Sequence, residues 1–165
     1  MTLDARREVR ARVNGRQTSV QVHTTTMLAD LLRDDLGLTG TKVSCDMQVC
    51  GACAVLVDGH PVSACTYLAI DVHERDVVTV EGLASSDGSL SELQQSFIDR
   101  FALQCGFCTP GFLMMATALL GENPRPTETE VREYLEGSIC RCSGYRPIVD
   151  AILAVCEGRG GTDGA

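Results

Sequence analysis

The chain has 165 residues, which is enough for one large domain or two small ones. Its 14 Lys and Arg against 22 Asp and Glu give a net charge of −8, so it lacks the basic surface with which proteins bind nucleic acids or anionic lipids. With 44% apolar residues but no apolar run of about 18, we expect a folded core and no insertion into a membrane. Residues 1–11 contain no apolar segment of a secretory signal, which predicts a cytoplasmic, reducing location.

The first predicted element is a hairpin. Residues 9–13 alternate apolar and polar side chains, Asn14-Gly15 follows, and the alternation resumes over residues 20–22. Because Asn-Gly accepts the positive φ values of a type I′ turn, the pattern predicts two antiparallel strands.

A short helix and three further strands are expected next. Thr25 or Thr26 is predicted to cap a helix over residues 27–32 that ends near Gly37. The remaining apolar runs predict strands, the first two joined by an Asp58-Gly59 turn, at residues 54–57, 62–65 and 77–80. A small mixed sheet packed on one helix is therefore expected, which makes residues 7–82 an α+β domain.

From residue 89 onward the apolar period becomes helical and predicts four helices. The first has a capping-box pattern at Ser89-Leu90-Ser91-Glu92 and an apolar stripe at Leu93, Phe97 and Phe101. Further helix starts are predicted at Thr109-Pro110, Thr127–Glu130 and Pro147, with ends at Gly121, Gly137 and Gly158. We expect a four-helix bundle domain at residues 89–157, a linker at 83–88 and a flexible tail at 158–165.

Nine cysteines are many for a chain that is expected to carry no structural disulfides. The first four read Cys45-x4-Cys50-x2-Cys53-x11-Cys65, and the next four read Cys105-x2-Cys108-x31-Cys140-x-Cys142. Cys156 stands alone on the last predicted helix and is interpreted as a core residue. Two sets of four indicate two four-thiolate sites.

Three interpretations compete for the first set. Disulfides conflict with the reducing location, and a structural zinc site needs two Cys knuckles, whereas Cys65 has no close partner. The spacing is that of plant-type [2Fe–2S] sites, and Gly51 allows close backbone approach. Taken alone, Cys140-x-Cys142 is equally typical of a zinc pair and of a redox pair. The presence of a first cluster favours a second cluster here, with its thiols at two predicted helix N-termini.

Three stretches carry a resemblance to a known family, namely CDMQVCGACAVLVDG at residues 45–59, QCGFCTPG at 104–111 and CRCSGY at 140–145. They resemble the iron–sulfur subunit of the molybdenum hydroxylases, the xanthine oxidase and aerobic carbon monoxide dehydrogenase family, over residues 7 to about 157. The resemblance implies a ferredoxin-like β-grasp domain, a four-helix bundle domain and one [2Fe–2S] cluster in each. The implied ligands are Cys45, Cys50, Cys53 and Cys65 for the first cluster, and Cys105, Cys108, Cys140 and Cys142 for the second.

The resemblance also implies partners. These are a large subunit with molybdopterin cytosine dinucleotide and a medium subunit with FAD, in a dimer of heterotrimers. Electrons would pass from the molybdopterin through the two clusters to FAD, with the second cluster nearest the pterin. Gln104 and Cys142 are similar to family residues that touch the pterin, and no residue of this chain is expected to be catalytic.

Two positions depart from the family pattern. Gln48 stands where many members have Gly, and Ser138 stands where many have Asn, which leaves the cluster potentials open but removes no ligand. Two alternatives remain at this point: an adaptor module with two zinc sites, and a free two-cluster ferredoxin.

Overall fold

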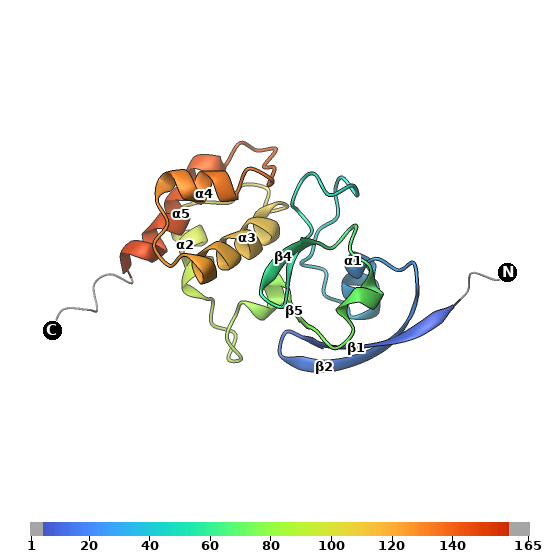
Figure 1. Ribbon diagram of the computed structural model, residues 1–165. Helices are drawn as coiled ribbons and strands as arrows, with labels where there is room; N and C mark the ends of the chain where they lie inside the picture. Colours follow the sequence, from blue (N-terminus) through green and yellow to red (C-terminus); the bar gives the residue numbers. More distant parts are fainter. Residues whose placement is uncertain (1–4, 159–165) are drawn as a thin grey trace.

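The computed structural model describes residues 5–158, and its first half contains a five-stranded mixed sheet (Figure 1). The strand order is β2-β1-β5-β3-β4, in which β1 and β5 are parallel and the other pairs are antiparallel. The strands are β1 Arg6–Val13, β2 Arg16–His23, β3 Ala54–Val57, β4 His60–Ser63 and β5 Asp76–Val78. The predicted α+β class is confirmed.

The hairpin forms as expected. Asn14 and Gly15 have φ values of 49° and 77°, and Val13 pairs with Arg16 across the turn. Because side chains alternate along a strand, Val9, Ala11 and Val13 all point into the core.

The short helix has a different start from the one predicted. It consists of α1 Leu28–Asp30 followed by a π-helical turn over Leu31–Asp35, and Met27 is its N-cap without a side-chain cap bond. The predicted Thr25 or Thr26 cap is therefore wrong. The free N–H groups of Leu28 and Ala29 instead donate to the carbonyls of residues 67 and 64, at 2.7 and 2.9 Å. A distant segment thus supplies the cap.

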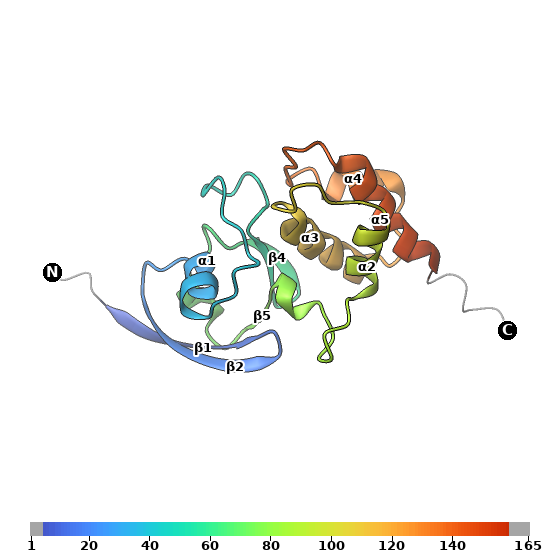
Figure 2. The same ribbon diagram turned by 180° about the vertical axis from the view of Figure 1, so that it is seen from behind.

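Four helices follow in the second half: α2 Glu92–Asp99, α3 Thr109–Glu122, α4 Glu128–Tyr134 and α5 Tyr145–Gly158 (Figure 2). They share one hydrophobic core, whose largest fully buried side chains are Phe97, Phe112, Val131, Ile148 and Ile152. None of the helices within residues 5–158 is long and apolar enough to cross a bilayer. Residues 159–165 of the predicted tail lie outside the described residues, and Gly158 is the last residue of α5.

The α2 helix differs from its prediction at both ends. Its capping box is formed by Ser91 and Gln94, because Ser89 is held in the preceding turn by two hydrogen bonds to Asp87 Oδ1. Phe101 does not continue the apolar stripe. It lies beyond the helix end with φ 53° and 82% exposure, and Ala102 takes the buried position. The Thr127–Glu130 capping box of α4 is confirmed, whereas Thr109 does not cap α3.

The two halves pack against each other through β3 and α3. All four β3 residues are buried: Val55 and Val57 face the core that contains α1, while Ala54 and Leu56 face Met114 and Ala118 of α3. The sheet is therefore covered on both faces at β3, and the N-terminus of α3 is placed beside the loop that precedes β3 (Figure 1).

Candidate metal centres

The first set of thiols lies on a loop before β3 and just after β4. Cys45, Cys50 and Cys53 belong to the loop, and Cys65 follows Ser63. The loop turns through the left-handed region at three residues, with φ values of 54° at Asp46, 60° at Gln48 and 70° at Gly51. Such reversals aim successive backbone N–H groups to one side, which suits an anionic occupant.

Hydrogen bonds and burial give the first thiols different acidities. The backbone N–H groups of Met47, then Val49 and Cys50, lower the pKa of Cys45 to about 6, and the Val49 N–H lies 3.4 Å from its Sγ. Burial raises the pKa of Cys53 to about 11. Cys45 is therefore more ready than Cys53 to bind a cation at neutral pH.

Within the first set the thiols interact in a chain. Cys45 interacts with Cys50, and Cys53 interacts with Cys65. The charge of Cys50 also raises the pKa of Cys53. All four predicted ligands of the first site are thereby linked.

The second set lies at the starts of two helices. Cys108 is the N-cap of α3, and Cys140 and Cys142 lie in the turns just before α5. Cys105 interacts with Cys142, and Cys108 interacts with Cys140 and Cys105. The predicted second set is therefore also linked, although 31 residues separate its halves.

Acidities again differ within the second set. The backbone N–H of Phe107, followed by the Cys142 thiol, lowers the pKa of Cys105, whereas burial and the Cys140 thiol raise the pKa of Cys108 to about 12. The N–H of Gly144 also donates to Cys140 Sγ at 3.3 Å. Amide donors thus surround these sulfurs as they do those of the first site.

The donors present fit [2Fe–2S] clusters. Each site offers four thiols, the number that the two irons of one cluster share, and a backbone N–H is directed at a sulfur in each site, from Val49 to Cys45 and from Gly144 to Cys140. None of the nine cysteines, which all lie within residues 5–158, forms a disulfide.

The two thiol sites meet at a close contact between the two halves. The Ile139 N–H donates to the Cys50 carbonyl at 2.9 Å, and so joins the residue before Cys140 to a residue of the first site. A Cβ on Gly111 would lie 2.3 Å from the Gly51 carbonyl oxygen, and a Cβ on Gly51 would lie 2.9 Å from Ser138 Oγ. Only glycine permits this approach.

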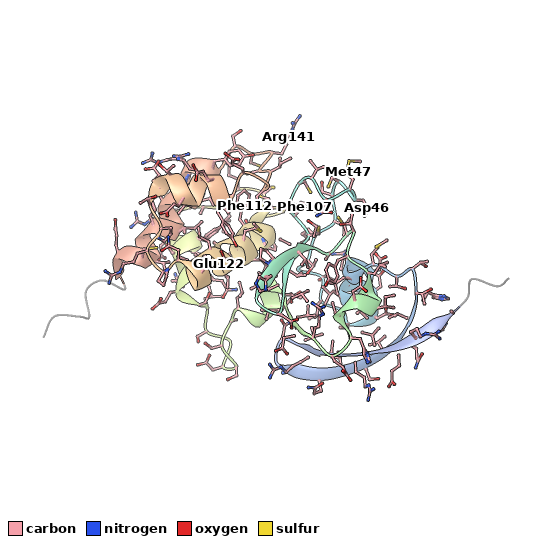
Figure 3. All side chains as sticks on the ribbon, viewed as in Figure 1. Asp46, Met47, Phe107, Phe112, Glu122 and Arg141 are labelled. Atoms are coloured by element: carbon pink, nitrogen blue, oxygen red, sulfur yellow. The ribbon has the colours of Figure 1, made fainter. Side chains whose placement is uncertain are left out.

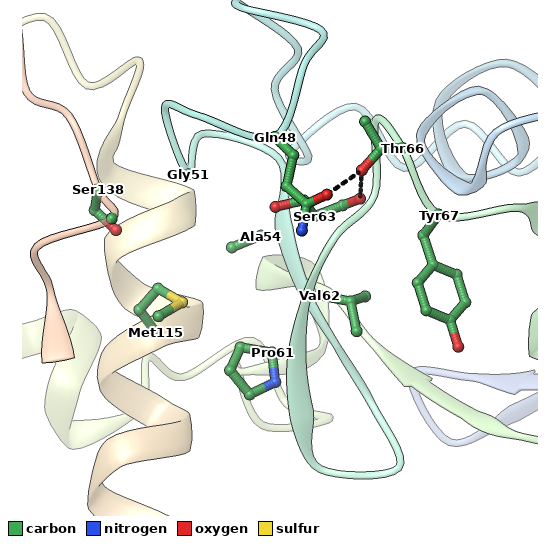
Figure 4. Close-up of a pocket in the computed structure, with 11 residues that line it drawn as sticks. Gln48, Gly51, Ala54, Pro61, Val62, Ser63, Thr66, Tyr67, Met115 and Ser138 are labelled. Carbon is green, nitrogen blue, oxygen red and sulfur yellow. Dashed lines mark hydrogen bonds between the residues drawn. The ribbon is translucent and has the colours of Figure 1, made fainter.

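A cavity of about 480 Å³ lies along the same contact (Figure 4). Both departures from the family pattern line it: Gln48 accepts a 3.1 Å hydrogen bond from Thr66, and Ser138 is 4% exposed. Among the described residues, Ser138 Oγ is one of two buried side-chain nitrogen or oxygen atoms without a hydrogen-bond partner. The departures are therefore neighbours around one cavity, on opposite sides of the contact between the halves.

Gln104 and Cys142, the predicted pterin-facing residues, are brought together. The Gln104 side-chain amide donates to the Cys142 carbonyl at 3.0 Å. Figure 3 shows Arg141 and Met47 projecting from the upper edge of the molecule, on the loops of the second and the first thiol set. The thiol-bearing loops thus share one edge.

The sequence pattern indicated the thiols but not the residues that hold the thiol-bearing loops in place. Tyr145, Ile139 and Gly111 were not singled out, and only Tyr145 and Gly111 lie within the stretches that carry the family resemblance. Cys156 is buried in the helical core, and its thiol donates to the Ile152 carbonyl at 3.4 Å, in agreement with its predicted packing role.

We expect Cys45 to be alkylated before Cys53 in the metal-free chain. Its rate with iodoacetamide should rise as pH increases through about 6, because the reactive thiolate forms there, and then level off. Cys53, with a pKa of about 11, should stay unreactive at pH 7. Peptide mass spectrometry after short labelling between about pH 5 and 9 measures both rates. Equal labelling of Cys45 and Cys53 at pH 7 would contradict the assigned acidities.

Comparison with known proteins agrees with this geometry. The chain matches the family model of the 2Fe-2S iron-sulfur cluster binding domain at residues 11–84 and that of the [2Fe-2S] binding domain at residues 79–153. It is 53% identical to the nicotine 6-hydroxylase small subunit of Paenarthrobacter nicotinovorans over 146 residues, covering 88% of this chain and 87% of that protein. It is 43% identical to the xanthine dehydrogenase iron-sulfur-binding subunit of Escherichia coli O157:H7, covering 88% and 91%.

A solved structure shows the same fold. Quinoline 2-oxidoreductase from Pseudomonas putida 86 contains a chain with a TM-score of 0.89 and 45% identity, covering 94% of this chain and 98% of that one. Sequence, fold and cluster-binding domain models therefore agree, and the chain belongs to the family of iron–sulfur subunits of the molybdenum hydroxylases.

Proposed function

We propose that this subunit carries electrons, one at a time, from a molybdopterin centre in a large partner subunit to FAD in a medium one. The clusters would be two [2Fe–2S] groups, held by Cys45, Cys50, Cys53 and Cys65, and by Cys105, Cys108, Cys140 and Cys142. When bound, each cluster accepts and releases a single electron. Substrate chemistry stays on the large subunit, and no residue here acts as an acid, base or nucleophile.

One observation carries the proposal: a backbone hydrogen bond joins the two four-thiol sites directly. The bond from the Ile139 N–H to the Cys50 carbonyl links the backbones of the two sites at 2.9 Å. A bonded path of backbone atoms therefore runs from Cys50 to Cys140 with one non-covalent step. A protein that used its thiols only to hold its fold together would not require this direct connection.

Exposed apolar side chains support two docking faces. Met47 and Val49, beside the first site, are 67% and 55% exposed, while Leu103 and Phe107, beside the second, are 44% and 46% exposed. Large exposed apolar groups mark surfaces that partners cover. We assign the second face to the subunit with molybdopterin cytosine dinucleotide, where Gln104 and Cys142 would contact the pterin, and the first face to the FAD subunit. A dimer of such heterotrimers completes the proposal.

The domain division is part of the same proposal. A ferredoxin-like β-grasp domain at residues 7–82 would hold the first cluster, and a four-helix bundle domain at residues 89–157 would hold the second, with a linker at 83–88. The separate hydrophobic cores of the sheet and the helices support it. The proposed location is the cytoplasm, where cysteines stay reduced and able to bind a cluster.

Iron, sulfide and subunit content test the proposal. The chain purified from its native source should contain about four irons and four acid-labile sulfides, absorb visible light, and elute with molybdenum- and flavin-containing subunits. A colourless preparation that contains zinc would refute the clusters. A coloured chain that elutes alone would keep the clusters and refute the complex.

A further inference from the structure

Tyr145 holds one ligand of the second site through its phenol oxygen. It is the first residue of α5, and its Oη accepts a hydrogen bond from the Cys140 backbone N–H at 3.0 Å. Its ring packs edge-on against Phe112, with ring centroids 6.3 Å apart and an angle of 75° between the rings. Phe112 is 1% exposed in α3, four residues after Cys108. The phenol oxygen is therefore fixed between the two helices that carry the second thiol set.

Two backbone N–H groups beside the second site have different acceptors. The Gly144 N–H donates to Cys140 Sγ at 3.3 Å, whereas the Cys140 N–H donates to the Tyr145 oxygen. The amide donor of a ligand residue is thus engaged away from the sulfurs.

Amide donors near sulfur tune a cluster's redox potential. Reduction adds one electron to the cluster and makes its sulfurs more negative, with no bond formed or broken. A donor directed at these sulfurs stabilises the reduced form and raises the potential. Withdrawing a donor has the opposite effect.

We propose that Tyr145 is a positioning residue that keeps the Cys140 N–H away from the second cluster and thereby lowers that cluster's midpoint potential. The inference rests on the proposed function, because it needs a cluster at Cys105, Cys108, Cys140 and Cys142. A lower potential at the second cluster favours onward transfer of each electron to the first. Tyr145 would thus help to set the direction of electron flow without touching a reacting atom.

Tyr145→Phe tests the inference in the full chain reconstituted with iron and sulfide. The variant keeps the ring against Phe112 and removes the acceptor, which frees the Cys140 N–H. In an EPR-monitored redox titration we expect a positive shift of the second cluster's potential and no shift of the first. Pulsed EPR should show one more exchangeable proton coupled to the second cluster than in the unmodified chain.

Tyr134→Phe is the matched control. The Tyr134 hydroxyl donates to Glu122 at 3.1 Å, at the far end of α3 from the thiols, so its loss should leave both potentials unchanged. An unchanged or more negative second potential in Tyr145→Phe would overturn the inference. Equal shifts of both clusters, or loss of the second cluster alone, would overturn it in favour of a purely structural role. Absence of clusters from the unmodified reconstituted chain would refute the proposed function itself.

Discussion

Cys108→Ser is expected to remove the second cluster and leave the first. Iron should fall from about four to about two per chain, and one of two reduced-state EPR signals should disappear. The reason is that the thiols with which Cys108 interacts, Cys105 and Cys140, belong to its own set, and that Cys108 caps α3 on the helical side of the contact between the halves. Iron analysis and EPR at low temperature measure both changes.

Cys156→Ala is the control for this prediction. Its thiol bonds within α5 to Ile152, so its removal should leave both signals and all the iron. Loss of both signals in a folded Cys108→Ser protein would show that the thiols are not divided into two independent sites. Loss of either signal in Cys156→Ala would make Cys156 a ligand.

Gly111→Ala is expected to push apart the contact between the two sites. The new Cβ would lie 2.3 Å from the Gly51 carbonyl oxygen, and neither backbone segment can rotate away as a side chain could. Overpacking of this kind typically costs about 1–3 kcal/mol in the free energy of unfolding. Urea unfolding measures that loss, and a weaker magnetic interaction between the two reduced clusters would report their separation.

Gly121→Ala provides the matched control within the same helix. Nothing lies within 4 Å of a Cβ placed there, so alanine should stabilise α3 by about 0.5–1 kcal/mol through its higher helix propensity. If both variants changed the unfolding free energy equally, the close approach at Gly111 would not be the cause.

Local patterns predicted the elements that depend on neighbouring residues alone. The hairpin at Asn14-Gly15 and the capping box at Thr127 and Glu130 involve residues one to three positions apart, so their signals are complete within a short window. The division of the thiols into two sets rests on spacings of the same local kind and stays a prediction.

Contacts between distant segments escaped prediction. The start of α1 is capped by carbonyls at residues 64 and 67, and Ser89 is held in its turn, so the polar residues before these two helices predict the wrong caps. Likewise, nothing in the spacing of Cys50 and Ile139 indicates that their backbones are hydrogen-bonded. Such pairs are chosen by the packing of β3 on α3, which no local pattern encodes.

The contact between Gly51 and residues 111 and 137–138 also bears on when metal can be loaded during biosynthesis. The first thiol loop is synthesised early, but its sheet closes only when β5 has paired with β1 and β3, and the loop meets its support only once Ile139 has been made. Domains generally fold as units as they emerge from the ribosome. Here the first site would reach its final shape only after Ile139 has been made, so we expect its cluster to be inserted after the helical half has been synthesised.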